Sequence, residues 1–188
     1  MPHVLGSLTL IALIAMVIFR VAMLRRHGIS AMNFGKIDKT DFLIPPFAFF
    51  YFYLIFAEAY AWPSVSQHEF FSSEVASWAG VVFCLFGLIV FALSLISFGN
   101  SFRVGIDSEV PGKLITFGVF AVTRNPIYVA FWIVLFGQYL IFPNWILLLY
   151  LGTATWLFHR QVLREEEFLI KHYGIEFEEY RSRVRRYV

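Results

Sequence analysis

Charged residues are scarce in this sequence. Asp, Glu, Lys and Arg make up 15% of the 188 residues, whereas soluble domains contain about 25%. The apolar share is 59%, and phenylalanine alone contributes 23 residues. This balance favours an integral membrane protein of one domain, in which lipid surrounds the helices. The net charge of +2 is too small to indicate binding to nucleic acid.

Cysteines and metal-ligand patterns are also scarce. The only cysteine, Cys84, lies in an apolar run, so the chain forms no internal disulfide and this thiol is expected in the core. His159 and His172 are not spaced to share a metal with each other or with a third ligand, so we predict no metal site. The sequence also lacks a glycine-rich phosphate loop of the kind that follows a strand.

Long apolar runs are the main feature that the sequence does have. A membrane-crossing helix needs roughly 20 predominantly apolar residues. We predict five spans, of which the last two are short and form a helical hairpin: Val4–Leu24, Phe42–Trp62, Val75–Phe98, Pro126–Phe142 and Trp145–Phe158. No basic residues precede the first run, so we interpret it as a retained span and not as a signal peptide.

Two further helices are expected after the fifth run. That run is predicted to continue into a polar helix, His159–Tyr173, with Gly174 as its C-cap. A final short helix over roughly Glu176–Arg186 places Phe177, Tyr180 and Val184 on one face. With arginines around that face, this helix is expected to lie on an anionic membrane surface.

The positive charges alternate along the chain. No Lys or Arg occurs at the N-terminal tip, in the loop Pro63–Glu74 or at the turn Pro143-Asn144, and all of them lie in or beside the other connections and the C-terminal segment. The positive-inside rule then places the N-terminus outside and the C-terminus in the cytoplasm. We therefore predict an all-α, polytopic membrane protein with one domain over residues 1–188, of which residues 1–98 form a three-helix part.

The motif Arg124-Asn125-Pro126 begins the fourth run. Pro126 suits the first position of a helix, and a helix N-terminus attracts carboxylates and phosphates. Tyr128, one turn further on, has a ring that could face a cation. Two plainer interpretations stay open: Arg124 as an anchor to lipid phosphate, and Tyr128 as an interfacial aromatic residue.

Three adjacent acids, Glu165, Glu166 and Glu167, follow the fifth run. At helical spacing they fan over about 200°, so they do not share one face. Glu165 lies on the stripe that continues the span, so we expect it to turn inward and the other two to be solvated. Glu58, near the outer end of the second run, indicates either a transport path or a lone interfacial acid.

Four short motifs in order resemble those of the isoprenylcysteine carboxyl methyltransferase family. This family belongs to a wider group that includes phospholipid N-methyltransferases. The resemblance covers about Gly99 to Tyr180 and rests on these segments: Gly99-Asn100-Ser101-Phe102, Leu114-Ile115-Thr116 with Gly118-Val119-Phe120, Arg124-Asn125-Pro126-Ile127-Tyr128, and Glu165-Glu166-Glu167-Phe168-Leu169 followed by Tyr173-Gly174 and Phe177 with Tyr180.

The resemblance implies a membrane methyltransferase that uses S-adenosyl-L-methionine. Its cofactor pocket would lie in residues 99–188 at the cytoplasmic face, covered by the C-terminal helices, and its lipophilic acceptor would enter from the bilayer. Carried over by position, Arg124, Asn125 and Tyr128 are the catalytic candidates. The cofactor contacts implied are Gly112, Lys113, Leu114, Ile115, Phe120, Asn125, Pro126, Ile127, Tyr128 and Glu165.

Three positions depart from the family pattern. Asn125 replaces the usual histidine, Phe120 replaces a tyrosine, and Gln161 stands where prenylcysteine methyltransferases carry an arginine suited to the substrate carboxylate. Arg103 could take over that role, so Arg103 and Gln161 are the substrate-binding candidates. The alternatives are a phospholipid N-methyltransferase, an NADPH-dependent membrane reductase resembling the sterol reductases, and a membrane protein without enzymatic activity.

Overall fold

The described part of the chain is entirely α-helical. The structure is a computed structural model, and it describes residues 1–26, 44–63, 69–99 and 112–187. Within these ranges the elements are α1 (Pro2–Arg26), α2 (Ile44–Ala59), α3 (Glu74–Phe98), the short 3-10 helix η3 (Gly118–Ala121), α4 (Pro126–Ile141), α5 (Trp145–Tyr173) and α6 (Ile175–Arg183). The predicted all-α fold is confirmed.

Two helices have the length and composition of membrane spans. Both α1 and α3 are long and apolar enough to cross a membrane, whereas the apolar helices Pro46–Ala59 and Pro126–Ile141 are shorter. Helix α5 is apolar in its first half and charged in its second half. The number of five spans and their orientation stay predictions.

Local sequence signals account for the starts of α3, α4 and α5 and for the end of α5. The Ser73 hydroxyl caps α3 by accepting from the backbone N–H of Ala76, and Pro126 occupies the first turn of α4. The Asn144 side chain caps α5 by accepting from the N–H of Leu147 at 2.9 Å. Gly174 ends α5 with a φ of +54°, a conformation that favours glycine. The continuous fifth helix is confirmed, and a short turn joins α4 to α5, whereas a hairpin of two membrane spans stays a prediction.

The end of the last helix differs from the prediction. Helix α6 stops at Arg183 and not near Arg186, and Val184 already has extended backbone. Phe177 and Tyr180 are buried inside the protein, at 0% and 4% exposed. The expectation that this face lies on a membrane surface is therefore wrong, because the protein itself covers it.

Helices α3 and α4 pack through glycines at very short range. A Cβ atom on Gly80 would lie 2.5 Å from the carbonyl oxygen of Gly137, and one on Gly137 would lie 2.7 Å from the Cys84 sulfur. Two turns further along α3, a Cβ atom on Gly87 would lie 2.7 Å from a side-chain carbon of Val134. Small residues let membrane helices approach in this way. The buried Cys84 belongs to this contact, as the sequence predicted for a core thiol.

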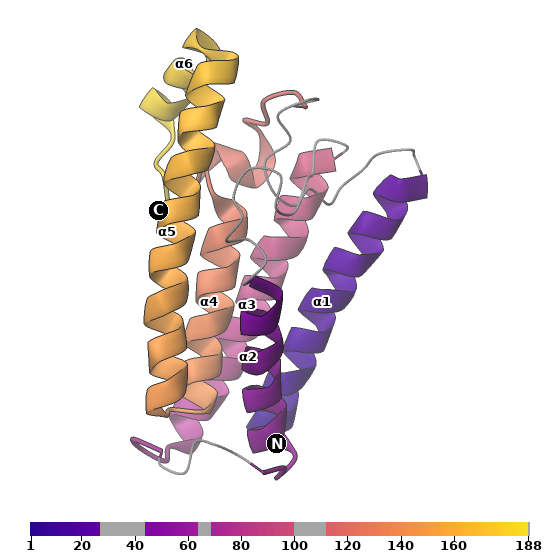
Figure 1. The fold of residues 1–188 in the computed structure, drawn as a ribbon, viewed down its shortest axis with the longest axis vertical. Coiled ribbons are helices and arrows are strands. Elements are labelled where there is room, and N and C mark those ends of the chain that lie inside the picture. The colour runs from indigo at the N-terminus through magenta and orange to yellow at the C-terminus, as the bar shows by residue number, and fades with distance from the viewer. Residues whose placement is uncertain (27–43, 64–68, 100–111, 188) are drawn as a thin grey trace.

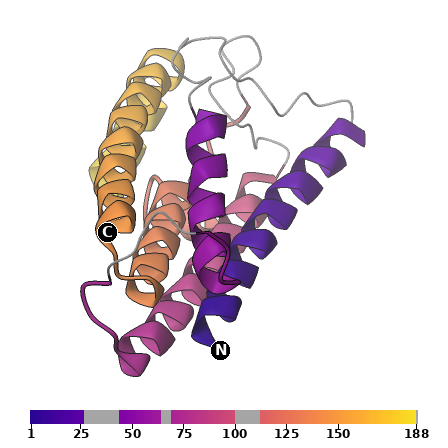
Figure 2. The same cartoon turned by 60° about the horizontal axis from the view of Figure 1, so that its bottom comes forward.

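The polar ends of the helices gather at one end of the molecule. Figure 1 shows the end of α1, the end of α3, the start of α4 and helix α6 at the top, whereas the N-terminus and the α4–α5 turn lie at the bottom. The turned view in Figure 2 gives the same arrangement. The two sequence motifs that start α4 and follow the apolar half of α5 are thereby brought to the same end.

Candidate functional site

A tyrosine from α4 meets a glutamate from α5. The Tyr128 hydroxyl donates to Glu165 Oε1 at 2.5 Å, and Gln161 Nε2 donates to the same oxygen at 3.1 Å. Burial raises the pKa of Glu165 above its ordinary value, although both hydrogen bonds act in the opposite direction. The prediction that Glu165 turns inward is confirmed, and its role toward a cofactor stays a prediction.

Aromatic rings line the apolar side of this pair. The Tyr128 ring packs against Phe158 of α5 with 5.6 Å between ring centroids, and Phe158 in turn contacts Phe131 at 5.9 Å. Through the Tyr128 hydroxyl, the Glu165 carboxyl is therefore linked to a group of aromatic rings from α4 and α5. Such a combination suits a ligand with one charged end and one apolar end.

Glu166 is the centre of a second polar cluster. It is 6% exposed, Arg124 donates to its Oε1 from Nε at 3.1 Å and from Nη2 at 2.9 Å, and Arg186 donates to its Oε2 from Nε at 3.0 Å and from Nη2 at 2.9 Å. Burial by itself raises the pKa of Glu166, but the two arginines outweigh that effect, so its pKa lies below the ordinary value.

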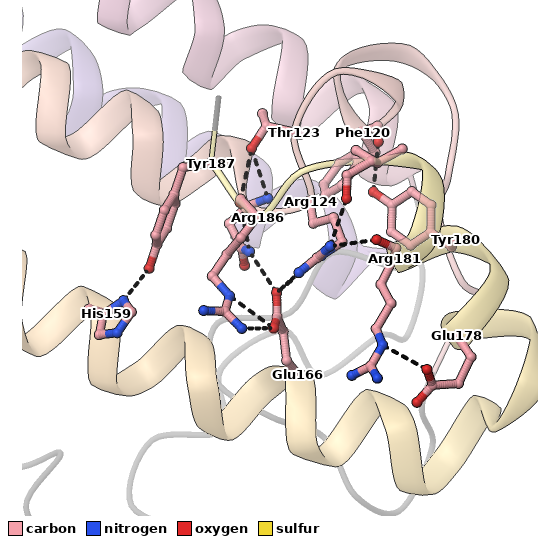
Figure 3. Close-up of polar contacts among 12 residues, drawn as sticks. Phe120, Thr123, Arg124, His159, Glu166, Glu178, Tyr180, Arg181, Arg186 and Tyr187 are labelled. Atoms are coloured by element: carbon pink, nitrogen blue, oxygen red, sulfur yellow. Dashed lines mark hydrogen bonds and ion pairs between the residues drawn. The ribbon is translucent and has the colours of Figure 1, made fainter.

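The expected solvation of Glu166 is therefore wrong. Helical periodicity correctly kept it off the face of Glu165, but a segment from beyond α6 folds back and covers it (Figure 3). Glu167 behaves as expected, because it is exposed and pairs with Lys171 one turn away at 2.6 Å.

Arg124 ties three parts of the chain together. Besides Glu166, its Nη1 donates to the carbonyl oxygens of Arg181 at 3.0 Å and Val184 at 2.6 Å. Only 10% of the Arg124 side chain is exposed. These contacts contradict the interpretation of Arg124 as a lipid-phosphate anchor, because its donors point into the protein. A catalytic role for Arg124 stays a prediction.

Asn125 is buried beside this cluster. It is 8% exposed, and its Nδ2 donates to the carbonyl oxygen of Arg186 at 3.1 Å and to Glu166 Oε1 at 3.5 Å. Both neighbours are acceptors, which fixes the amide nitrogen on their side. The amide oxygen of Asn125 consequently faces the other way.

Residues 184–187, which we call the tail, run alongside the Arg124-Asn125-Pro126 turn. Thr123 and Arg185 form an isolated parallel bridge, and the Arg124 N–H donates to the Arg185 carbonyl at 3.0 Å. At the far end, His159 Nδ1 lies 2.8 Å from the Tyr187 hydroxyl. Figure 3 shows the tail held between this turn and α5. No sequence pattern indicated these contacts, because the tail lies about 20 to 60 positions away from its partners.

The remaining predicted cofactor residues differ in exposure and in contacts. The Gly112 carbonyl accepts from the Tyr173 hydroxyl, Lys113 is exposed, and Leu114 and Ile115 are half-buried. Phe120 is buried and packs edge-on against Phe98 at 4.6 Å.

Two other parts of the prediction concern α4 and the substrate residues. Pro126 is buried, and Ile127 packs on the apolar cluster formed with α1 and α3. Gln161 contacts Glu165 as described above, whereas Arg103 lies outside the described residues. Within the described ranges, no group of three or more His, Cys, Asp or Glu side chains lies close enough together to hold a metal ion.

The chain is similar in sequence to proteins described as methyltransferases. Residues 75–176 match the family model described as phospholipid methyltransferase. A rice protein (Oryza sativa subsp. indica) described as a probable protein-S-isoprenylcysteine O-methyltransferase is 30% identical over 130 residues, which cover 68% of this chain and 65% of that protein. The protein-S-isoprenylcysteine O-methyltransferase of the rat (Rattus norvegicus) is 29% identical over 126 residues, which cover 65% of this chain and 43% of that protein.

A yeast relative shows the same partial overlap. The protein-S-isoprenylcysteine O-methyltransferase of Schizosaccharomyces pombe is 30% identical over 125 residues, covering 65% of this chain and 52% of that protein. This chain thus spans less than two thirds of the length of these relatives. The tail lies beyond the residues that the family model matches.

Proposed function

Because the chain belongs to the phospholipid methyltransferase family, we propose that it transfers a methyl group from S-adenosyl-L-methionine to a lipophilic acceptor. The observation that carries this proposal is the Tyr128–Glu165 pair, in which a half-buried carboxyl from α5 meets an aromatic hydroxyl from α4. Both residues lie inside the matched range. The distant isoprenylcysteine methyltransferase homologues, which align with about two thirds of the chain, support the same reaction class.

The residues present fit the chemistry of this cofactor. When bound, S-adenosyl-L-methionine supplies a methyl group activated on a positively charged sulfur. The Glu165 carboxylate offers an acceptor for an ammonium or for ribose hydroxyls, and the Tyr128 ring offers a face for a cation. The Asn125 amide oxygen, turned away from Glu166, offers a further acceptor. The role of these groups is to bind and align, and alignment alone lowers the barrier to displacement.

The acceptor is proposed to reach this site from the bilayer. The aromatic rings of Tyr128, Phe158 and Phe131 pack together and are suited to contact the apolar chain of such an acceptor. We further propose five spans with the N-terminus outside and the site facing the cytoplasm. The alternation of basic and non-basic connections supports this orientation.

A second acceptor class has specific support. A carboxylate acceptor needs a cation, but the position of the arginine in prenylcysteine methyltransferases is occupied by neutral Gln161, whose amide is bonded to Glu165. Arg124 and Arg186 are both engaged with Glu166. An amine acceptor, as in phospholipid N-methylation, needs no cation at this position and is therefore the second candidate, whereas a carboxylate acceptor would depend on Arg103, which lies outside the described residues.

Calorimetry on the purified full chain in detergent tests the proposal. We expect binding of S-adenosyl-L-methionine and of its demethylated product, and a loss of about tenfold or more in affinity for Glu165→Ala, since a hydrogen bond to a charged group contributes about 1.5–3 kcal/mol. The exposed Glu167→Ala is the matched control and should bind as the wild type does.

Two outcomes would count against the proposal. The absence of binding at millimolar cofactor would contradict it and would favour a membrane protein without this activity. Displacement of the cofactor by NADPH, followed by reduction of a lipid substrate, would instead support the reductase alternative.

A further inference from the structure

We propose that Arg186, in the tail beyond the family match, is a positioning residue that fixes the Glu166 carboxylate and, next to it, the amide of the cofactor-binding candidate Asn125. This proposal rests on the proposed function for its cofactor readout. Arg186 reaches the site twice, through its guanidinium and through its carbonyl oxygen. Figure 3 shows it between the Arg124 turn and Glu166.

The guanidinium of Arg186 completes the pairing of a buried carboxylate. Arg124 occupies only Oε1 of Glu166, and both contacts to Oε2 come from Arg186. The Glu166 side chain is 8% exposed, so solvent is a poor substitute for the missing partner. Without the Arg186 side chain, Glu166 would keep three contacts at Oε1 and lose both contacts at Oε2, so its carboxylate would be held from one side only.

The carbonyl of Arg186 determines how the Asn125 amide points. It accepts from Asn125 Nδ2 at 3.1 Å and from the Thr123 hydroxyl at 3.2 Å. Glu166 Oε1, held by Arg124, is the second acceptor for Nδ2. Two acceptors on one side keep the amide oxygen of Asn125 on the opposite side. Arg186 thereby supplies one of the two acceptors directly, and its guanidinium fixes the carboxylate that supplies the other.

The tail has other anchors, so the loss of the Arg186 side chain should loosen the tail locally without releasing it. The Arg185 carbonyl accepts from the Arg124 N–H, and the Val184 carbonyl accepts from Arg124 Nη1. The Tyr187 hydroxyl contacts His159. The effect of Arg186→Ala is therefore expected at Glu166 and Asn125 and not on the fold as a whole.

The experiment compares Arg186→Ala with Arg185→Ala in the purified full chain. Arg185→Ala is the matched control. Arg185 is adjacent to Arg186 and has an exposed side chain, and its substitution by alanine removes the same charge. Calorimetry with the demethylated cofactor should show a loss of about tenfold or more for Arg186→Ala and less than about twofold for Arg185→Ala. Arg186→Lys should recover part of the affinity, because an ammonium keeps the charge but not the paired geometry.

A double-mutant cycle separates positioning from a general structural role. In a Glu166→Gln background, Arg186→Ala should cost less than about threefold in affinity, because the partner through which Arg186 acts has been neutralised. A full tenfold loss in that background would overturn the proposal. Equal losses for Arg185→Ala and Arg186→Ala would also overturn it.

Hydrogen exchange gives a readout that does not depend on cofactor binding. The Arg124 amide should exchange faster in Arg186→Ala than in the wild type and in Arg185→Ala, since its acceptor lies in the tail. A wild type that binds no cofactor would contradict the proposed function only. In that case, an Arg124 amide that exchanges equally fast in the wild type and in Arg186→Ala would overturn the positioning role of Arg186. Faster exchange with unchanged affinity in a cofactor-binding wild type would overturn it as well.

Discussion

Three adjacent glutamates in α5 have three different environments. Glu165 is held by Tyr128 and Gln161, Glu166 by two arginines, and Glu167 by an exposed lysine one turn away. The pKa of Glu165 is raised by burial, whereas that of Glu166 is lowered by its partners despite burial. Neighbouring positions on one helix thus have opposite electrostatic behaviour, because each faces a different part of the chain.

The lowered pKa of Glu166 predicts acid sensitivity. Since its folded-state pKa lies below the ordinary 4.5, its ion pairs stabilise the fold fully above that pH, and their contribution is lost as the pH falls through the folded-state value. Glu166→Gln should lower the free energy of unfolding at pH 7 by about 3–5 kcal/mol, because it breaks a buried pair. The difference from the wild type should shrink as the pH falls below 4.5.

Unfolding temperatures in detergent between pH 7 and pH 3 measure this effect. Glu167→Gln, at an exposed pair, should follow the wild type over the whole range. A difference between the wild type and Glu166→Gln that does not change with pH would contradict the explanation by ion pairing.

At the scale of elements, α3 and α4 form the closest helix pair described. Their contact depends on one glycine from each helix, Gly80 of α3 and Gly137 of α4, which leave no room for a side chain between them. The aromatic residues that line the candidate site, Tyr128 and Phe131, also lie on α4. The packing of α3 against α4 therefore sets where the polar turn at the start of α4 lies.

A methyl group at this contact should destabilise the protein. A Cβ atom on Gly137 would lie 2.6 Å from the Gly80 carbonyl oxygen and 2.7 Å from the Cys84 sulfur. Overpacking of this kind costs about 1–3 kcal/mol, so Gly137→Ala should lower the unfolding temperature. Gly152→Ala, in α5 with nothing within 4 Å, is the matched control and should be neutral or slightly stabilising. Equal effects of the two substitutions would contradict this account of the α3–α4 contact.

At the scale of the whole molecule, the orientation in the membrane can be tested with two serines. Ser72 lies before α3, at the end where the N-terminus lies, and Ser182 lies in α6 at the other end; both are exposed. In a Cys84→Ala background, we expect an impermeant maleimide on intact cells to label Ser72→Cys and to label Ser182→Cys only after permeabilisation. Labelling of Ser182→Cys alone on intact cells would reverse the proposed orientation, and labelling of both would contradict five spans.

Most of the helices could be predicted from the sequence by itself. The ends at Pro126, Asn144 and Gly174 follow from backbone chemistry that acts within a few residues. The inward position of Glu165 followed from the periodicity of a single helix, because it requires only the direction of the apolar stripe. These features are local, so the residues that determine them are neighbours in the sequence.

Only the tertiary structure determined which distant residues meet. Arg186 pairs with Glu166 and orients Asn125 because the chain leaves α6 at Arg183 and turns back, and no local pattern encodes that return. The close approach at Gly80 and Gly137 likewise needs two helices to be placed side by side. The sequence determined the Tyr128 and Glu165 motifs as separate segments, and the packing of α4 beside α5 brought them into one site, because a contact between two helices depends on how the chain folds between them.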